Sequence, residues 1–256
     1  MIDHIANISA LLSSGLAIGL GGIGSGIGAG YAASGAVSSM ARQPSANPLL
    51  FNQMLINQAL ASNPSILALI VALILFMIGT DTELPAATSW AQASALMGAG
   101  IAIGIGAFGA GIASGFVGRD AIQSIGKCPS GQGRVSVIML IGQAWCQTPN
   151  IFAFVVALIL IYLAPAYDSI LAAEGVNGIA DEIIWSGKFL GMGLAMGFGS
   201  LGPSIGIGYI FAYCCRALLD QPKYQTNIRN VAFVGAAVTE TCVIYALIIA
   251  LLLRYS

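Results

Sequence analysis

Charged residues are scarce in this sequence. Lys, Arg, Asp and Glu make up 7% of its 256 residues, whereas they make up about 25% of ordinary soluble domains. Hydrophobic residues account for 57% of the chain. The few basic residues form no stripe of the kind that nucleic-acid phosphates require, so no nucleic-acid partner is expected. A composition this apolar predicts a polytopic protein of packed helices in a lipid bilayer.

Cysteine and histidine are also too few and too scattered to build a site. The five cysteines are odd in number, lie in or beside apolar segments and show no zinc spacing. The single histidine, His4, stands alone beside the N-terminus. The same N-terminal segment carries Asp3 and has no basic region, so a cleaved signal peptide is not expected. The glycine-rich runs lack the Lys-Ser/Thr ending of a phosphate loop. We therefore expect no cofactor and no resident metal.

An internal repeat organises the chain. Three apolar segments align without gaps from Ser62, Gln147 and Glu240, which are 85 and 93 residues apart. Each follows a glycine-rich apolar stretch, at residues 8–40, 91–125 and 185–218, in which small residues recur every fourth position and allow close helix packing. A short polar loop with proline joins the two segments each time, which predicts a helical hairpin.

The fold class predicted from this repeat is an all-α membrane protein. It has six transmembrane helices, arranged as three tandem hairpins at residues 1–80, 88–164 and 183–256. Most basic residues flank the hairpin loops, so the positive-inside rule predicts that these loops are cytoplasmic and that both termini lie on the opposite side. These residues are Arg42, Arg119, Lys127, Arg134, Arg216, Lys223 and Arg229.

One carboxylate lies inside the last apolar run. Residues 231–253 are long enough to cross a bilayer as a helix, and Glu240 falls near the middle. An ionised carboxylate at that depth is costly, so Glu240 must be protonated, paired or bound to a cation. An intramembrane acid is by default a functional residue, although a neutral glutamate that only bonds neighbouring helices is the plainer alternative.

Several motifs resemble the proteolipid (c or K) subunit of rotary ATPases. The first glycine helix contains Gly26-Ile-Gly-Ala-Gly-Tyr31 and leads to Arg42-Gln43-Pro44, similar to the loop of that family that contacts the central stalk. The third hairpin repeats this with Gln221-Pro222, although Asp220 stands where the arginine would be. The last helix carries Glu240-Thr241 and then Tyr245, like the ion-carrying helix of the family.

This resemblance implies a non-catalytic subunit of a membrane rotor. Copies would close into a homo-oligomeric ring in a bacterial plasma membrane, and the ring would meet an arginine of a stator (a or I) subunit. Glu240, Thr241 and Tyr245 would bind the ion. The central stalk would contact the cytoplasmic loops through Arg42, Gln43, Pro44, Gln221 and Pro222.

The departures from the family pattern concern the acid itself. Ser62 and Gln147 stand where the first two hairpins would carry a carboxylate. They could be simple losses after triplication, or they could reduce the ions carried per turn, as in V-type pumps that hydrolyse ATP. An F-type rotor working mainly in synthesis is the alternative.

The transported ion is expected to be H⁺, with Na⁺ as the alternative. Sodium-binding relatives use a glutamine of the glycine helix, and here those positions hold Ala29, Ser114 and Ile207. Polar side chains from other hairpins could still complete a sodium site at Glu240, or could only bond between helices. These candidate accessory ligands are Ser62, Asn63, Gln147 and Thr148.

Two other functional classes fit the sequence less well. A six-helix channel or secondary transporter would place several polar groups around one pore and often has inverted repeats, whereas these repeats are parallel. A purely structural scaffold would leave Glu240 without a role.

Overall fold

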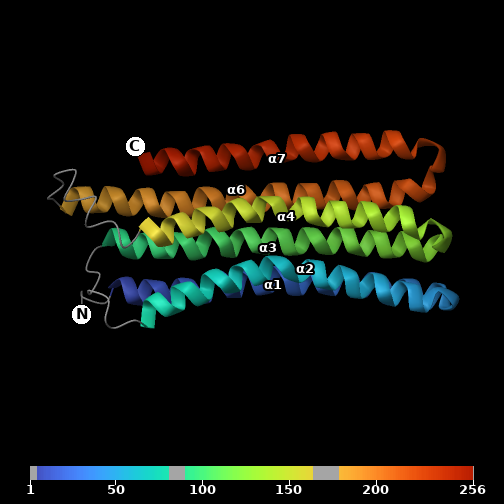
Figure 1. Cartoon of the computed structure of the whole chain (residues 1–256), viewed down its shortest axis with the longest axis horizontal. Helices are drawn as coiled ribbons and strands as arrows, with labels where there is room; N and C mark the ends of the chain where they lie inside the picture. Colours follow the sequence, from blue (N-terminus) through green and yellow to red (C-terminus); the bar gives the residue numbers. More distant parts are fainter. Residues whose placement is uncertain (1–4, 81–89, 164–178, 256) are drawn as a thin grey trace.

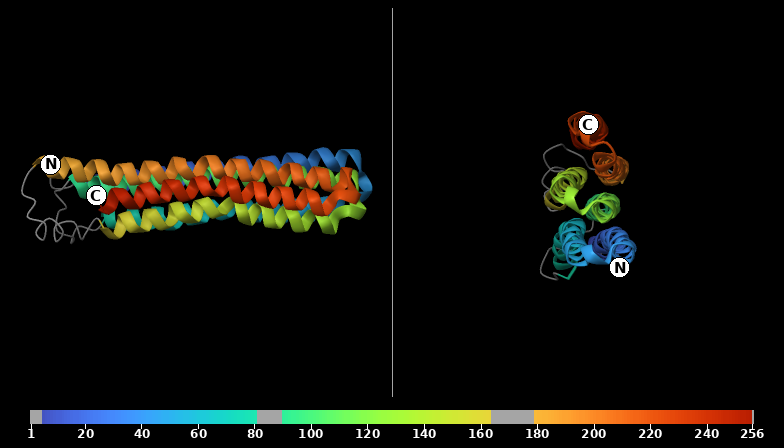
Figure 2. Two further views of the ribbon diagram at one scale, coloured as in Figure 1. Left: turned by 90° about the horizontal axis from the view of Figure 1, so that it is seen from above. Right: turned by 90° about the vertical axis from the view of Figure 1, so that its right-hand side faces the viewer.

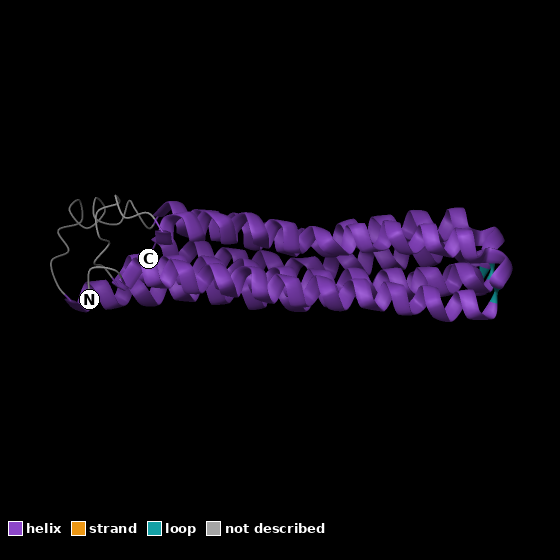
Figure 3. Cartoon of the chain, turned by 90° about the horizontal axis from the view of Figure 1, so that it is seen from below, coloured by secondary structure: helices purple, strands orange, loops and turns teal. Residues whose placement is uncertain are grey.

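The chain folds into six long helices. The computed structural model describes residues 5–80, 90–163 and 179–255, and these ranges contain no strand (Figure 3). The long helices are α1 (Ile5–Arg42), α2 (Asn47–Thr80), α3 (Trp90–Lys127), α4 (Gln132–Leu163), α6 (Ile179–Asp220) and α7 (Gln225–Tyr255). All six are long and apolar enough to cross a bilayer. The predicted helical membrane architecture is confirmed.

The helices pair into three hairpins whose turns are alike. Short 3-10 helices make the turns: η2 (Pro44–Ala46), η3 (Pro129–Gly131) and η4 (Pro222–Tyr224). The residue before each proline is extended, with φ of −137°, −140° and −132° at Gln43, Cys128 and Gln221, because a proline ring disfavours the helical region for its predecessor. All three turns lie at one end of the bundle, and α1 begins and α7 ends at the other (Figure 1).

The hairpins stand side by side and form two rows. Viewed end-on, α1, α3 and α6 make one row and α2, α4 and α7 make the other (Figure 2). We call these the glycine row and the acid row. Helix α3 is the centre of the molecule, since its most extensive contacts are with α1 on one side and α6 on the other.

The glycine row uses one interface twice. A Cβ on Gly115 of α3 would collide with the backbone of Gly28 on α1. At the equivalent place one repeat later, a Cβ on Gly208 of α6 would lie 2.8 Å from the backbone of Ala113 on α3. Glycine is needed at Gly115 and Gly208 because the helix backbones approach too closely for any side chain.

The same register holds nearer the other end of these helices. A Cβ on Gly100 would meet the carbonyl oxygen of Ser13, and a Cβ on the equivalent Gly193 would meet that of Gly98. The third hairpin is therefore placed on the second as the second is placed on the first.

An aromatic stack follows the same repeat. The rings of Tyr31 and Phe116 have centroids 5.1 Å apart, and those of Phe116 and Tyr209 have centroids 4.7 Å apart. These three residues occupy equivalent positions on α1, α3 and α6. Tyr209 ends the series within the chain, and 48% of it is exposed.

The acid row and the outer sides of the bundle expose many large apolar side chains. Ile66 and Phe76 on α2 and Leu252 on α7 are each more than half exposed. Soluble proteins rarely expose apolar surface on this scale, and lipid is the solvent in which such a surface is stable.

One ion pair joins the second and third hairpins near their turns. Arg216 of α6 donates to Asp120 of α3 at 2.5 Å; the Asp120 side chain is 8% exposed and that of Arg216 is 44% exposed. The aspartate is thus buried and depends on its counter-charge, whereas the guanidinium can reach solvent. Neither partner has a charged equivalent in the first hairpin, where Gly35 and Ser38 stand.

This asymmetry predicts unequal costs for removing the two charges. Arg216→Gln leaves a buried carboxylate without its cation and is expected to destabilise the chain by roughly 2 kcal/mol or more. Asp120→Asn leaves only a solvated arginine and is expected to cost about 1 kcal/mol. Unfolding temperatures of the two variants in the same detergent measure the difference; a larger loss for Asp120→Asn would contradict it.

Candidate ion-binding site

Glu240 lies midway along α7 and is partly buried. It faces the second hairpin, because its Oε2 accepts a hydrogen bond from the indole Nε1 of Trp145 on α4 at 2.6 Å. Among the described residues, Trp145 is the only side chain that donates to Glu240. A tryptophan nitrogen is a donor and never an acceptor, so the bond fixes which carboxyl oxygen accepts.

Trp145 is not among the site residues predicted from the sequence. Its equivalents in the first and third hairpins are Leu60 and Val238, which are aliphatic. An alignment of the three repeats shows that a tryptophan replaces an aliphatic residue in the second repeat only, two positions before Gln147. This difference is a sequence signal for a special role of Trp145. Its partner could not be read from the alignment, because the two residues are 95 positions apart.

An aromatic cluster surrounds the indole. The ring centroid of Trp145 is 5.8 Å from that of Phe211 on α6 and 5.9 Å from that of Phe233 on α7, and the two phenylalanines are 6.0 Å apart. Phe211 fits because α4 has Gly142 opposite it, where a Cβ would lie 2.5 Å from the phenylalanine Cβ. The indole that bonds Glu240 is therefore packed against aromatic rings of the third hairpin.

The two positions equivalent to Glu240 make different bonds. Ser62 is exposed, and its hydroxyl donates to the carbonyl oxygen of Gln58 in its own helix. Gln147 donates through Nε2 to the carbonyl oxygen of Leu60 on α2 at 3.0 Å. Leu60 is the equivalent of Trp145, and Gln147 is the equivalent of Glu240. In both pairs, the residue at the Glu240 position of one hairpin therefore contacts the residue at the Trp145 position of the preceding hairpin.

Among the described residues, none of the other predicted ligands forms a hydrogen bond with Glu240. Thr241 donates to the carbonyl oxygen of Val238 at 2.7 Å, and Tyr245 is 63% exposed. Asn63 lies on α2, which α4 separates from α7 in the end-on view (Figure 2). Thr148 lies on α4, three residues after Trp145 and so on the same face of the helix.

On α6, the position at which sodium-binding relatives use a glutamine is apolar. Gly206 of α6 lies against Thr239 of α7, where an added Cβ would be 3.1 Å from the threonine methyl, and the next residue, Ile207, is fully buried. In the second hairpin the equivalent Ser114 donates to the carbonyl oxygen of Ala110. The described residues contain no cluster of three or more His, Cys, Asp or Glu side chains.

The loop residues predicted to contact a stalk lie together at the turn end of the bundle. Arg42 ends α1, and Gln43 links it to Pro44 of η2; Gln221 and Pro222 occupy the same positions in the third hairpin. All but the partly buried Gln43 are exposed. They are therefore available to a partner at that end.

Comparison with known proteins matches each hairpin separately. The family model of the ATP synthase C subunit matches residues 12–75, 97–160 and 190–253. Ser62, Gln147 and Glu240 lie at the same distance from the start of each match.

Individual curated relatives cover about one hairpin of this chain. The ATP synthase c subunit of Syntrophobacter fumaroxidans is 46% identical over 79 residues, which are 31% of this chain and 88% of that protein. The protein of the same name from Petrotoga mobilis is 38% identical over 85 residues, 33% of this chain and 88% of that protein. That of Thermotoga maritima is 39% identical over 80 residues, 31% of this chain and 94% of that protein.

Proposed function

This chain belongs to the family of the ATP synthase C subunit, and on that premise we propose that it forms the ion-translocating rotor ring of a rotary ATPase. Several copies close into a ring with the glycine row inside and the acid row facing the lipid. Each chain carries one ion, at Glu240. The observation that carries this proposal is a single intramembrane acid held at a hairpin–hairpin contact that the chain repeats.

The glycine row supports assembly with further copies. Gly30 of α1 is the equivalent of Gly115 and Gly208, and Gly15 is the equivalent of Gly100. Those equivalents meet the backbone of the preceding helix, whereas no atom of another described helix lies within 4 Å of a Cβ placed on Gly30 or Gly15. By the same repeat, α6 of another copy would pack against the free face of α1 that carries Gly15 and Gly30.

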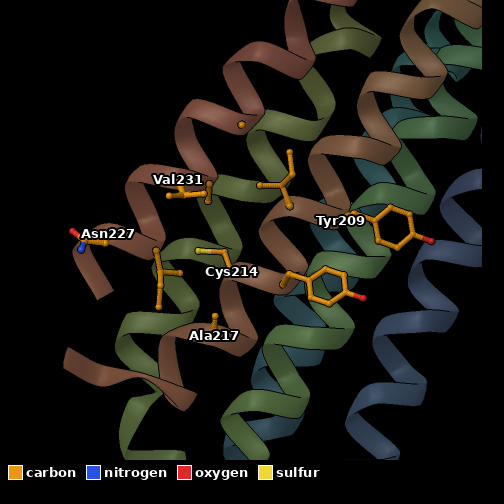
Figure 4. A pocket seen from close by; sticks show the side chains of 10 residues that line it. Tyr209, Cys214, Ala217, Asn227 and Val231 are labelled. Carbon is orange, nitrogen blue, oxygen red and sulfur yellow. The ribbon is translucent and has the colours of Figure 1, made fainter. Parts of the chain in front are cut away.

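An apolar groove on the third hairpin supports the same assembly. It lies between α6 and α7 and includes Tyr209, Cys214, Val231 and Gly235 (Figure 4). Gly235 is the equivalent of Asn57 and Gly142. Those two are covered by α3 and α6 of the following hairpin, so α1 of a second copy would cover Gly235.

Protons are the ion that the surroundings of Glu240 favour. A sodium ion needs several oxygen ligands, whereas the side chain that bonds Glu240 among the described residues is an indole N–H, which cannot bind a cation. On α6, the position at which sodium-binding relatives use a glutamine holds the buried, apolar Ile207. A proton needs only the carboxyl group and a hydrogen-bond partner. Ser62, Asn63, Gln147 and Thr148 then act in packing between helices, as Gln147 does with Leu60.

The cycle follows from the cost of charge in lipid. Protonated Glu240 is neutral and can pass through the bilayer as the ring turns. At the stator, an arginine of the a or I subunit stabilises the ionised carboxylate, and the proton leaves toward one side. A new proton loads from the other side. Central-stalk subunits take up the rotation at the turn loops, through Arg42, Gln43, Pro44, Gln221 and Pro222; ATP is handled by partner subunits.

One acid for every three hairpins sets the number of ions moved per turn, and so the number moved per ATP. Moving one charge against 100 mV costs about 2.3 kcal/mol, so a rotor that carries fewer ions per turn spends more ATP free energy on each. This favours a V-type-like pump driven by ATP hydrolysis. Synthesis is the second candidate, because the relatives are named as parts of ATP synthases.

The exposed basic residues at the turns support an orientation in a bacterial plasma membrane. Arg42, Arg134, Lys223 and Arg229 are exposed at that end of the bundle, which the positive-inside rule assigns to the cytoplasm. Both ends of the chain then lie outside.

Carbodiimide labelling of assembled rings tests the ion and the site together. We expect a hydrophobic carbodiimide to modify Glu240, and sodium to give no protection. Vesicles with the whole complex should take up protons on ATP addition without sodium. Protection of Glu240 by sodium, or ATP-driven uptake that requires sodium, would contradict proton coupling.

A further inference from the structure

The acid lies at an internal contact of the chain. Glu240 belongs to the third hairpin, and it faces back toward the second through Trp145. Gln147 and Leu60 form the same contact between the first and second hairpins. If the repeat continues from one copy to the next, Val238 of one copy contacts Ser62 of the following copy. Neither of those side chains is an acid, so the contacts between copies and the contacts within a chain differ in chemistry.

The aromatic cluster around Trp145 has no counterpart elsewhere in the described chain. Its three aromatic members, Trp145, Phe211 and Phe233, come from three different helices and pack within 6.0 Å of one another. At the equivalents of Phe233 the other hairpins carry Leu55 and Leu140. The aromatic cluster therefore exists only where the acid exists.

The hydrogen bond has a chemical consequence for the bound proton. The indole N–H occupies Oε2, which must be the accepting oxygen in either charge state. In the neutral acid the carbonyl oxygen is the stronger acceptor, so this bond favours Oε2 as the carbonyl oxygen and the proton on Oε1. The fully buried ring of Phe211 packs against the indole and limits its rotation, so the carboxyl group presents its hydroxyl in one direction.

We propose that Trp145 is the positioning residue for Glu240, and that the proton site is complete within one chain, between the second and third hairpins. This inference rests on the proposed rotor function and specifies its site. Contacts between copies, at Val238 and Ser62, serve assembly alone. For the acid to meet the stator, the bond from Trp145 must break, so Trp145 also sets how readily the carboxyl group swings out.

The matched variants are Trp145→Phe and Phe233→Leu. The first removes the N–H but keeps an aromatic ring; the second removes a ring from the same cluster, installs the residue of the other two repeats and keeps the N–H. Loss of one hydrogen bond corresponds to a change of roughly fivefold in an equilibrium. We expect carbodiimide to label Glu240 about fivefold faster in Trp145→Phe rings and less than about twofold faster in Phe233→Leu rings.

A spectroscopic signature separates positioning from packing. The carbonyl stretch of protonated Glu240 should move to higher frequency in Trp145→Phe, because its acceptor bond is lost, and should stay in place in Phe233→Leu. A second measurement needs no substitution and so does not depend on the folding of a variant. In the native ring, the indole Raman band that reports N–H bonding should shift when carbodiimide modifies Glu240. Unchanged labelling and carbonyl stretch in Trp145→Phe, or an unmoved indole band, would overturn the inference.

Failure of this inference is distinguishable from failure of the rotor function. If native Glu240 is labelled and needed for transport but Trp145→Phe behaves as native, only the positioning role is wrong. If Glu240 is not labelled in native rings, the proposed function itself fails.

Discussion

Replacing Glu240 by glutamine is expected to abolish ion transport completely while the ring still assembles. Glutamine keeps the size of the side chain and can still accept the hydrogen bond from Trp145, but it cannot release and rebind a proton. No other acid lies midway along a described membrane helix, so nothing replaces it. ATP-driven proton uptake into vesicles should fall to background, and carbodiimide labelling of the chain should disappear.

The matched control is Gln147→Leu, at the equivalent position of the second hairpin. It removes the bond to the carbonyl oxygen of Leu60, which is worth about 1 kcal/mol of stability, and it touches no titrating group. Transport should persist in this variant. Normal transport by Glu240→Gln would mean that the ion site lies elsewhere.

Gly30→Leu is expected to prevent ring assembly and yet leave the single chain folded. Gly30 is exposed, and in the described part of the chain no other helix lies within 4 Å of a Cβ placed there. Its equivalents Gly115 and Gly208 both lie too close to a neighbouring backbone for a side chain. A leucine should therefore block α6 of the next copy. Native mass spectrometry of detergent-extracted protein should find folded single chains in place of rings.

Gly133→Leu is the control for the Gly30 variant. Gly133 is exposed although its hairpin has a neighbour on both sides, so its equivalents should also be free in the ring. Rings should form normally. If Gly30→Leu also forms normal rings, copies do not pack through the face of α1 that carries Gly15 and Gly30.

Local sequence determines most of the fold. Pro44, Pro129 and Pro222 predict turns, and each opens a 3-10 helix in the structure. The first helix is predicted at residues 8–40 and runs from Ile5 to Arg42. Helix ends are set by backbone bonds, such as that from Gln43 to the carbonyl oxygen of Ser39, which hydropathy does not register.

The site is predicted in part. The repeat locates Glu240 and its two replaced equivalents, because position within an aligned repeat is a property of sequence. Its hydrogen-bond partner depends on how α4 packs against α7, and Trp145 enters through that packing. Thr241 and Tyr245 are close to the acid along the chain, but Thr241 bonds within its own helix. Their part in ion binding stays a prediction.

The ion pair between Asp120 and Arg216 shows the same limit. The two residues are 96 positions apart, and neither recurs in the other repeats. The sequence assigns Arg216 to a cytoplasmic flank, whereas the structure also makes it the counter-charge of a buried aspartate. Side chains that break a repeat can be noticed in the sequence, but their partners become visible only in three dimensions.

The most direct measurement is the number of protons carried per revolution of the rotor, counted against the number of chains in the same ring. A proton site at Glu240 alone predicts one proton per chain, and hence one for every three hairpins. Three protons per chain, or a count unrelated to the number of chains, would contradict a rotor that works through this single acid.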